Sequence, residues 1–167
     1  DSETIGNPDL LTLDIEGEGS MLYQIVGRHY VPWSLPVPGD EPMTIEVAYD
    51  KTQLAVDDIA QATATVRNNR PHAAQMVIVD LGIPPGFQVV TPDLDALVTA
   101  GTVQKYELTG RQIILYFEEL APNAAVALQY QLRAKFPLRA KTPESSVYAY
   151  YNPEVRHVAA PQDIVVE

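Results

Sequence analysis

The residue types that most often perform chemistry are sparse in this sequence and widely spaced. The three histidines show none of the His-x-x-x-His or Glu-x-x-His spacings that bring two ligands to one metal ion. We therefore interpret His29, His72 and His157 as surface or structural residues. Ser20 lies in the segment 17–21, which lacks the second glycine of a Gly-x-Ser-x-Gly nucleophile elbow and fits a turn between two strands. These patterns predict no catalytic residue.

Acidic residues form pairs that could hold a metal ion or act on a glycosidic bond. The residues are adjacent at 57–58 (Asp-Asp) and 118–119 (Glu-Glu), and Asp93 and Asp95 lie two positions apart. Carboxylate oxygens are ligands that calcium prefers, but no pair has the spacing of an EF-hand loop. Glycosidases use two converging carboxylates, and spacing along a chain does not show convergence. We favour solvated carboxylates at loops and helix starts, and predict no metal site and no cofactor.

The segment 147–153, Val-Tyr-Ala-Tyr-Tyr-Asn-Pro, concentrates tyrosine. In an extended strand, Tyr148 and Tyr150 lie on one face and Tyr151 lies on the other. A face of two tyrosine rings could stack on a sugar or on a protein partner. The interpretation that we favour is a packed strand whose hydroxyl groups reach backbone groups at the edge of a sheet.

The charge and composition of the chain exclude several classes of protein. With 11 Lys and Arg against 22 Asp and Glu, the formal net charge is −11. Such a surface repels phosphate and anionic lipid, so we expect no nucleic-acid partner. The absence of cysteine removes disulfides, thiolate zinc sites and cysteine nucleophiles. No apolar run approaches the roughly 20 residues of a membrane span, so we expect no membrane span in this chain.

The elements that must position any site are mainly strands, because the dominant hydrophobic period is two. The segment 125–136 predicts a half-buried strand whose core-facing side carries Val126, Leu128, Tyr130, Leu132, Ala134 and Phe136. The same alternation occurs in three other segments, 11–16, 43–50 and 60–67. The runs 76–79 and 113–117 are apolar on both faces and predict central strands covered on both sides. Short strands between Asn, Gly, Pro and Asp clusters predict an all-β fold, an antiparallel immunoglobulin-like β-sandwich.

One segment, residues 92–100, predicts a short α-helix. Pro92 suits the first helical position, and Thr91 before it could cap the helix. Gly101 is suited to end it. The face that docks on the sheet is predicted from the apolar residues at helical spacing, which are Leu94, Leu97 and Val98.

A proline-rich stretch divides the chain. Four prolines fall within the segment 32–42, which predicts a stiff linker or a crossover. Two strand-like runs, about 10–16 and 20–31, precede it, and we expect seven or eight strands after it. We therefore divide the chain here into 1–37 and a β-sandwich domain of residues 38–167. Because two strands alone are marginally stable, the leading segment either packs on this domain or is the tail of a neighbouring one.

Four segments carry a more specific pattern. An apolar strand that ends in an acid leads into the turn Ile-Pro-Pro-Gly-Phe at 83–87, and the short helix closes before Lys-Tyr-Glu at 105–107. The strand 113–120 contains Leu-Tyr-Phe-Glu-Glu, and 147–153 follows near the end. In this order, they resemble the C-terminal receptor-binding domain of the alpha-2-macroglobulin family over about residues 73–155. Residues 10–31 are similar to the last strands of the module that precedes this domain in the family.

The resemblance implies a function without bond making. In this family, a protease cleaves a bait segment in another module, and the terminal domain then moves and becomes exposed. The chain would be a non-enzymatic binding and interdomain-packing module of a protease-trapping protein, either secreted or in the cell envelope. Its partners would be other domains of the parent chain. The alternative is an unrelated extracellular adhesion or carbohydrate-binding module that uses Tyr148, Tyr150 and loop carboxylates with calcium.

The resemblance also assigns a candidate partner-binding site to the short helix. The family's receptor contact uses two lysines spaced four apart, and the matching positions here are Thr91 and Asp95. Neither residue can dock into the acidic calcium cage of a lipoprotein-receptor module. The disulfide of the vertebrate domain and the cysteine of the family's thioester are also missing from this chain. These departures imply a bacterial-type relative whose helix faces a different protein partner, if it has one.

Overall fold

The computed structural model describes Gly17 and residues 41–167. The predicted strands at 11–16 and 20–31, together with Ser20 and His29, lie outside the described residues. The chain divides into two units, Asp1–Val31 and Pro32–Glu167. The fold described below is that of residues 41–167.

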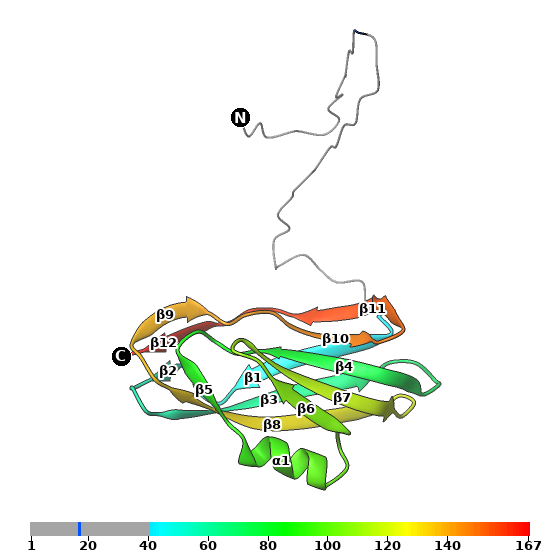
Figure 1. Ribbon diagram of the computed structural model, residues 1–167, viewed down its shortest axis with the longest axis horizontal. Coiled ribbons are helices and arrows are strands. Elements are labelled where there is room, and N and C mark those ends of the chain that lie inside the picture. Colours follow the sequence, from blue (N-terminus) through cyan, green and yellow to red (C-terminus); the bar gives the residue numbers. More distant parts are fainter. Residues whose placement is uncertain (1–16, 18–40) are drawn as a thin grey trace. The chain divides into compact units, whose positions relative to one another are not determined.

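Residues 41–167 form twelve strands and one helix (Figure 1). The strands are β1 (Met43–Tyr49), β2 (Gln53–Leu54), β3 (Ile59–Asn68), β4 (Ala74–Gly82), β5 (Phe87–Val90), β6 (Lys105–Leu108), β7 (Gln112–Leu120), β8 (Ala125–Ala134), β9 (Leu138–Lys141), β10 (Ser145–Ala149), β11 (Asn152–Ala159) and β12 (Asp163–Val166). The helix α1 (Pro92–Thr99) lies between β5 and β6 in the chain. The expected seven or eight strands were too few, because five of the strands have only two to four residues, which is too short for alternation to identify them in the sequence.

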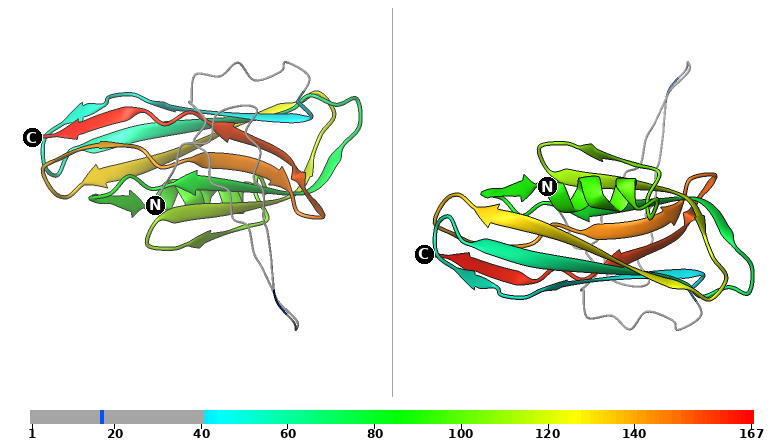
Figure 2. Two further views of the ribbon diagram at one scale, coloured as in Figure 1. Left: turned by 90° about the horizontal axis from the view of Figure 1, so that it is seen from above. Right: turned by 90° about the horizontal axis from the view of Figure 1, so that it is seen from below.

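The strands form three sheets that confirm the predicted all-β sandwich with one short helix. A four-stranded sheet has the order β1-β3-β8-β5, and a five-stranded sheet has the order β11-β10-β4-β7-β6. A small sheet, β2-β12-β9, contains a parallel pair, β2 with β12, whereas the other strand pairs of the described residues are antiparallel. The strands run roughly along one direction (Figure 2). The β10–β11 turn and the C-terminal residue lie at opposite ends of the domain (Figure 1).

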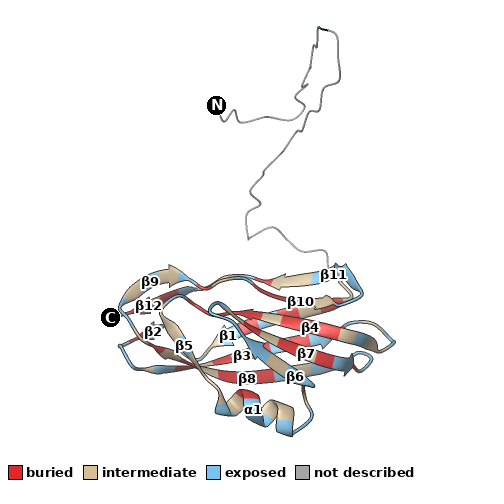
Figure 3. Ribbon diagram, viewed as in Figure 1, coloured by how far each residue is buried: buried red, intermediate tan, exposed pale blue. Residues whose placement is uncertain are grey.

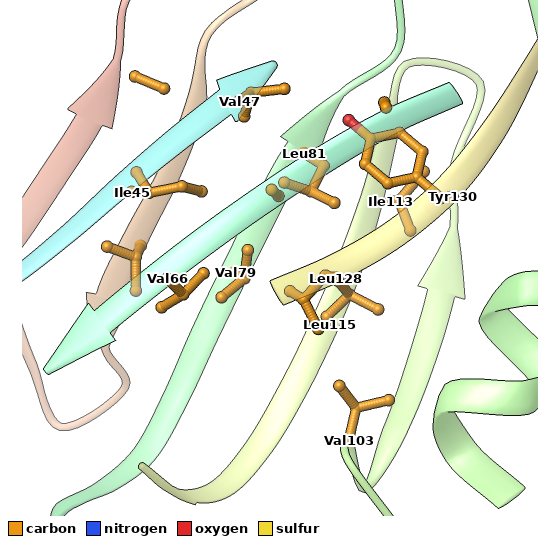
Figure 4. Packing of buried hydrophobic residues seen from close by; sticks show 14 of the residues in the cluster. Ile45, Val47, Val66, Val79, Leu81, Val103, Ile113, Leu115, Leu128 and Tyr130 are labelled. Atoms are coloured by element: carbon orange, nitrogen blue, oxygen red, sulfur yellow. The ribbon is translucent and has the colours of Figure 1, made fainter. Parts of the chain in front are cut away.

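The core lies between the two large sheets and is built from the predicted alternation. Ala62 and Ala64 of β3 face Tyr130 and Leu128 of β8, so small side chains leave room for large ones. All four are at most 1% exposed. The five-stranded sheet contributes its own inner residues, which include Val79, Leu81, Ile113 and Leu115 (Figure 4). Buried residues accordingly concentrate on the strands that face each other (Figure 3).

The prediction that Phe136 lies in the core is wrong, since its side chain is 66% exposed. Strand β8 ends at Ala134, whose carbonyl accepts a hydrogen bond from the Asp57 amide at 2.8 Å. The Lys135 amide then donates to the carbonyl of Gly86 at 2.8 Å. These loop contacts end the ladder before Phe136, although the alternation continues in the sequence.

The apolar runs at 76–79 and 113–117 do form interior strands of the five-stranded sheet, as predicted. Their outer face is covered less than expected. Ile78 is buried, whereas Ile114 and Tyr116 are only half-buried. Tyr116 is covered on one side by the Lys105 ammonium, which lies 4.2 Å from the centre of the ring. The ammonium is attracted to the face of the ring, so Lys105 covers part of this outer face of the sheet.

Candidate interaction sites

The short helix α1 is held on the sandwich by the face that the sequence predicts. Leu94 is fully buried, and Leu97 and Val98 are half-buried against the main core. The helix contacts β8 of one sheet and β6 of the other. It therefore packs against strands of both sheets, and its anchoring depends on apolar packing.

The structure confirms the prediction for the C-terminal end of α1 but not for its N-terminal end. The C-terminal end forms the predicted glycine stop, because Gly101 has φ +71° and its amide donates to the Val98 carbonyl at 3.0 Å. The Thr102 amide donates to the Leu97 carbonyl at 3.0 Å, which completes a Schellman motif. The predicted cap by Thr91 is wrong, since its side chain makes no capping hydrogen bond. Its backbone is helical, with φ −77° and ψ −23°, whereas a capping residue is normally extended.

The two positions that match the family's receptor lysines lie one helical turn apart. The Thr91 carbonyl accepts the Asp95 amide at 3.0 Å, Thr91 is half-buried and Asp95 is exposed. The Asp95 carboxylate accepts a hydrogen bond from the Tyr106 hydroxyl at 2.6 Å. This hydrogen bond to the ionised carboxylate raises the pKa of Tyr106. The helix surface is therefore acidic at this site, and its charge already has an internal partner.

The tyrosine-rich segment forms a hairpin and not the packed strand that we favoured. Strand β10 ends at Ala149, which pairs with Asn152, so Tyr150 and Tyr151 form the turn. Tyr150 is 54% exposed and Tyr151 is 79% exposed. Their rings are 5.1 Å apart at an interplanar angle of 86°, an edge-to-face pair. Tyr148 remains half-buried in β10, so it does not share an exposed face with Tyr150.

The half-buried carboxyl group of Asp80 lies at the base of this hairpin. Asp80 of β4 pairs with Ser146 of β10, and its Oδ2 accepts a hydrogen bond from the Gln112 side chain at 2.6 Å. Its Oδ1 is buried and has no hydrogen-bond partner among the described residues. Desolvation raises the pKa of Asp80, and the positive charge of Arg156 opposes this rise in part. The folded chain therefore binds a proton on this side chain more readily than the unfolded chain does.

The adjacent acidic residues are engaged separately. Asp57 forms an ion pair with Lys135 at 3.2 Å, and Asp58 forms one with Lys51 at 3.4 Å. Glu119 accepts a hydrogen bond from the Gln75 side chain at 2.7 Å. Within the described part of the chain, no three His, Asp or Glu side chains gather as they would to hold a metal ion.

The two described histidines differ. His72 is exposed in the loop between β3 and β4. His157 is half-buried on β11, where its Nδ1 accepts the Ile45 amide at 3.0 Å and its Nε2 lies 2.9 Å from a carboxylate oxygen of Glu41. Its spacing in the sequence carried no signal for these contacts, because both partners are more than a hundred residues away.

The fold defines residues 41–167 as an all-β sandwich domain with one short helix packed on it. The sequence model of the A-macroglobulin receptor binding domain matches residues 72–161, more than half of the chain. The chain therefore belongs to this family, as the four motifs predicted. The matched range contains the helix, the tyrosine hairpin and His157.

Solved structures with the same fold come from bacterial alpha-2-macroglobulins. Salmonella alpha-2-macroglobulin reacted with methylamine matches at 18% identity and a TM-score of 0.65, over 81% of this chain and 10% of that chain. Trypsin-activated alpha-2-macroglobulin from Escherichia coli matches at 16% identity and a TM-score of 0.65, over 80% of this chain and 11% of that one. A native Escherichia coli fragment, from domain MG7 to the C-terminus, matches at 17% identity and a TM-score of 0.64, over 81% and 25%.

These relatives are much longer than the chain described here. It spans about a tenth of the two full relatives that it matches. In the described part of the chain, no helix is long and apolar enough to cross a membrane.

Proposed function

We propose that the chain is a non-enzymatic module of a protease-trapping alpha-2-macroglobulin-like protein, and that it packs against other domains of its parent. The family match and the shared fold of the bacterial proteins support this proposal. The parent would be secreted or lie in the cell envelope. Two of these relatives were solved after reaction with methylamine or activation by trypsin, chemistry that belongs to those proteins.

The observation that carries interdomain packing is the exposed pair Tyr150–Tyr151. Two large rings at a turn, 54% and 79% exposed, leave apolar area in water that the isolated domain does not cover. Tyrosine is enriched at protein interfaces because it combines a large apolar ring with a hydroxyl group that can hydrogen-bond.

The packing is tested by hydrogen exchange on the chain alone and on its parent protein. We expect the amides of residues 149–152 to be more protected in the parent. Tyr151→Ala in the parent should remove this added protection. Phe136→Ala is the matched control, because it removes an exposed ring from a different loop. Equal protection in both proteins, or equal effects of both substitutions, would contradict a role for the hairpin.

The absence of bond-making activity has its own test. We expect that the isolated chain neither inhibits proteases nor incorporates methylamine, since it has no cysteine for a thioester. Mass spectrometry after incubation with methylamine gives the readout. A covalent adduct on the chain would overturn this part of the proposal.

The second candidate function is carbohydrate binding by an adhesion-type module. The exposed tyrosine pair is the observation that favours it. The edge-to-face arrangement at 86° gives the pair no common flat surface for a sugar ring, and this weakens the case for carbohydrate binding. A glycan array with and without calcium would separate the two functions, because binding there would favour the adhesion module.

A further inference from the structure

The two large sheets meet along a seam between β1 and β11. Each is the edge strand of its own sheet, and the two strands contact each other without a shared ladder. An edge strand presents backbone N–H and C=O groups that have no partner in its own sheet. The seam must satisfy these groups in another way.

Side chains from β11 and from the loop that follows it bond to this edge of β1. The Ile45 amide donates to Nδ1 of His157 at 3.0 Å. The Val47 carbonyl accepts a hydrogen bond from the side chain of Gln162. His157 lies opposite Val147, which is fully buried, so the imidazole is on the inner side of β11. The imidazole of His157 and the side-chain amide of Gln162 therefore take the place of a neighbouring strand.

The contacts determine where the imidazole carries its proton. Because Nδ1 accepts the Ile45 amide, the proton of the neutral ring is on Nε2. That nitrogen lies 2.9 Å from Oε2 of Glu41, and the two side chains are 14% and 21% exposed. The Glu41 carbonyl in turn accepts the Asn69 side-chain amide at 3.0 Å. The neutral ring thus joins three segments, which are residue 41, β1 and β11.

We propose that His157 is a proton-operated latch on this seam. A proton from solvent binds Nδ1, and the ring nitrogen can then no longer accept the Ile45 amide. The Nε2–H bond to Glu41 remains and becomes charge-assisted. Acid therefore releases the edge of β1 but keeps residue 41 on β11. Histidine is the side chain whose charge ordinarily changes between about pH 5 and 8.

Glu41 is the ionisable group in contact with the ring. Glu46 on β1 alternates to the outer side, next to the buried Ile45 and Val47. Glu154 and Arg156 on β11 are exposed on the face opposite to His157. On β10, the residue opposite the ring is the apolar Val147. Among the described residues, the contact that acid would change is therefore the one between this imidazole and this carboxylate.

The test is nuclear magnetic resonance of the full chain at pH 7.5 and pH 5.0. Nitrogen spectra of the ring report its tautomer and charge, and amide exchange reports the protection factor of Ile45. The Ile83 amide, which donates to the Arg111 carbonyl at 2.7 Å away from the seam, is the internal reference. We expect the Nε2–H tautomer at pH 7.5. At pH 5.0, we expect the protection of Ile45 to fall roughly three- to tenfold relative to Ile83, the loss of about one hydrogen bond.

Two variants separate the latch from a general effect of acid. His157→Asn places a side-chain amide oxygen, which accepts a hydrogen bond but does not titrate, near the position of Nδ1. The protection of Ile45 in this variant should therefore be the same at both pH values. His72→Asn, at the exposed histidine, should leave the acid response unchanged.

Three results would overturn the proposal. The ring of the native chain could stay neutral at pH 5.0, Ile45 could keep its protection when the ring is charged, or the response could survive His157→Asn. The comparison on the native chain decides the matter even where a variant does not fold, and it does not depend on the proposed function.

Discussion

The helix α1 and the β10–β11 hairpin are both appended to the sandwich, but they differ in what they leave in water. The helix buries Leu94 completely, and the charge of its exposed Asp95 already accepts the Tyr106 hydroxyl. The hairpin exposes Tyr150 and Tyr151, whose rings contact each other. Covering apolar surface with a partner is favourable. Covering a polar surface whose groups already have hydrogen-bond partners contributes little to binding. The comparison indicates that α1 mainly stabilises the domain and that the hairpin is available for a partner.

The strongest test of this contrast compares the stability cost of each element. We expect Leu94→Ala to lower the free energy of unfolding by about 2–4 kcal/mol, because it leaves a cavity between the helix and both sheets. Tyr151→Ala should cost less than about 0.5 kcal/mol, because the ring is mostly in water. Urea denaturation of the two variants gives both values. If Tyr151→Ala were as costly as Leu94→Ala, the hairpin would be a structural element too.

The second test reverses the charge on the exposed side of the helix. We expect the native chain to show no measurable binding to a lipoprotein-receptor module, because Asp95 and the net charge of −11 oppose its acidic calcium cage. The pair Thr91→Lys and Asp95→Lys should fold with a loss of about 1 kcal/mol, since Asp95 is exposed and only its bond to Tyr106 is lost.

Surface plasmon resonance and urea denaturation measure the two parts of this second prediction. Tyr106→Phe is the matched control, because it removes the same hydrogen bond without changing the charge. Clear binding by the native chain would show that the wrong positions or the wrong partner were transferred from the family. A double variant that does not fold would show that this side of α1 is needed for stability.

A shortened chain tests whether the sandwich that carries both the helix and the hairpin folds without residues 1–37. We expect residues 38–167 to fold cooperatively with a thermal midpoint within about 3 °C of the full chain, because the described core is complete within residues 43–166. Circular dichroism gives the secondary structure and the midpoint. A shortened chain that is unfolded, while the full chain is stable, would show that residues 1–37 belong to the same sandwich and that the boundary near residue 38 is wrong.

The smallest expected effect concerns Asp80 at the base of the hairpin. Its pKa is raised above the ordinary value of 3.8, so its contribution to stability is present below that value and is lost as the pH rises through the folded-state pKa. Asp80→Asn removes the buried charge and can still accept the Gln112 side chain. We expect it to raise the thermal midpoint by about 1–3 °C at pH 7 and to have no such effect near pH 3.

Asp163→Asn is the control for this measurement, because Asp163 is exposed and pairs with Lys141. It should change the midpoint at pH 7 by less than Asp80→Asn. A lower midpoint for Asp80→Asn at pH 7 would show that the ionised carboxylate stabilises the hairpin base.

Local patterns were sufficient for most of the fold. Alternation placed Ile45, Val66 and Leu128 in the core, and helical spacing identified the docking face around Leu94. Both patterns are read from neighbours in the chain, since a strand repeats every two residues and a helix every three to four. The errors occurred where a distant segment decides the outcome. Phe136 is exposed because loop contacts from Asp57 and Gly86 end β8 two residues earlier.

The candidate sites were predicted less completely than the fold. The positions of Thr91 and Asp95 came from a family resemblance, and their role in binding a partner stays a prediction. The helical backbone of Thr91 and the turn at Tyr150 depend on how the neighbouring strands pair, which composition does not show. The contacts of His157 were not predicted at all, because its partners Ile45 and Glu41 come from the opposite end of the domain sequence.

By itself, the sequence determined the all-β class, the position of the helix and its glycine stop, and membership of the family through four ordered motifs. These properties depend on short segments, whose residue order already contains the required spacing. Only the tertiary structure decided which tyrosines are exposed and which carboxyl group is desolvated. It also brought His157 of β11 to the edge of β1, because the sandwich places the last long strand beside the first.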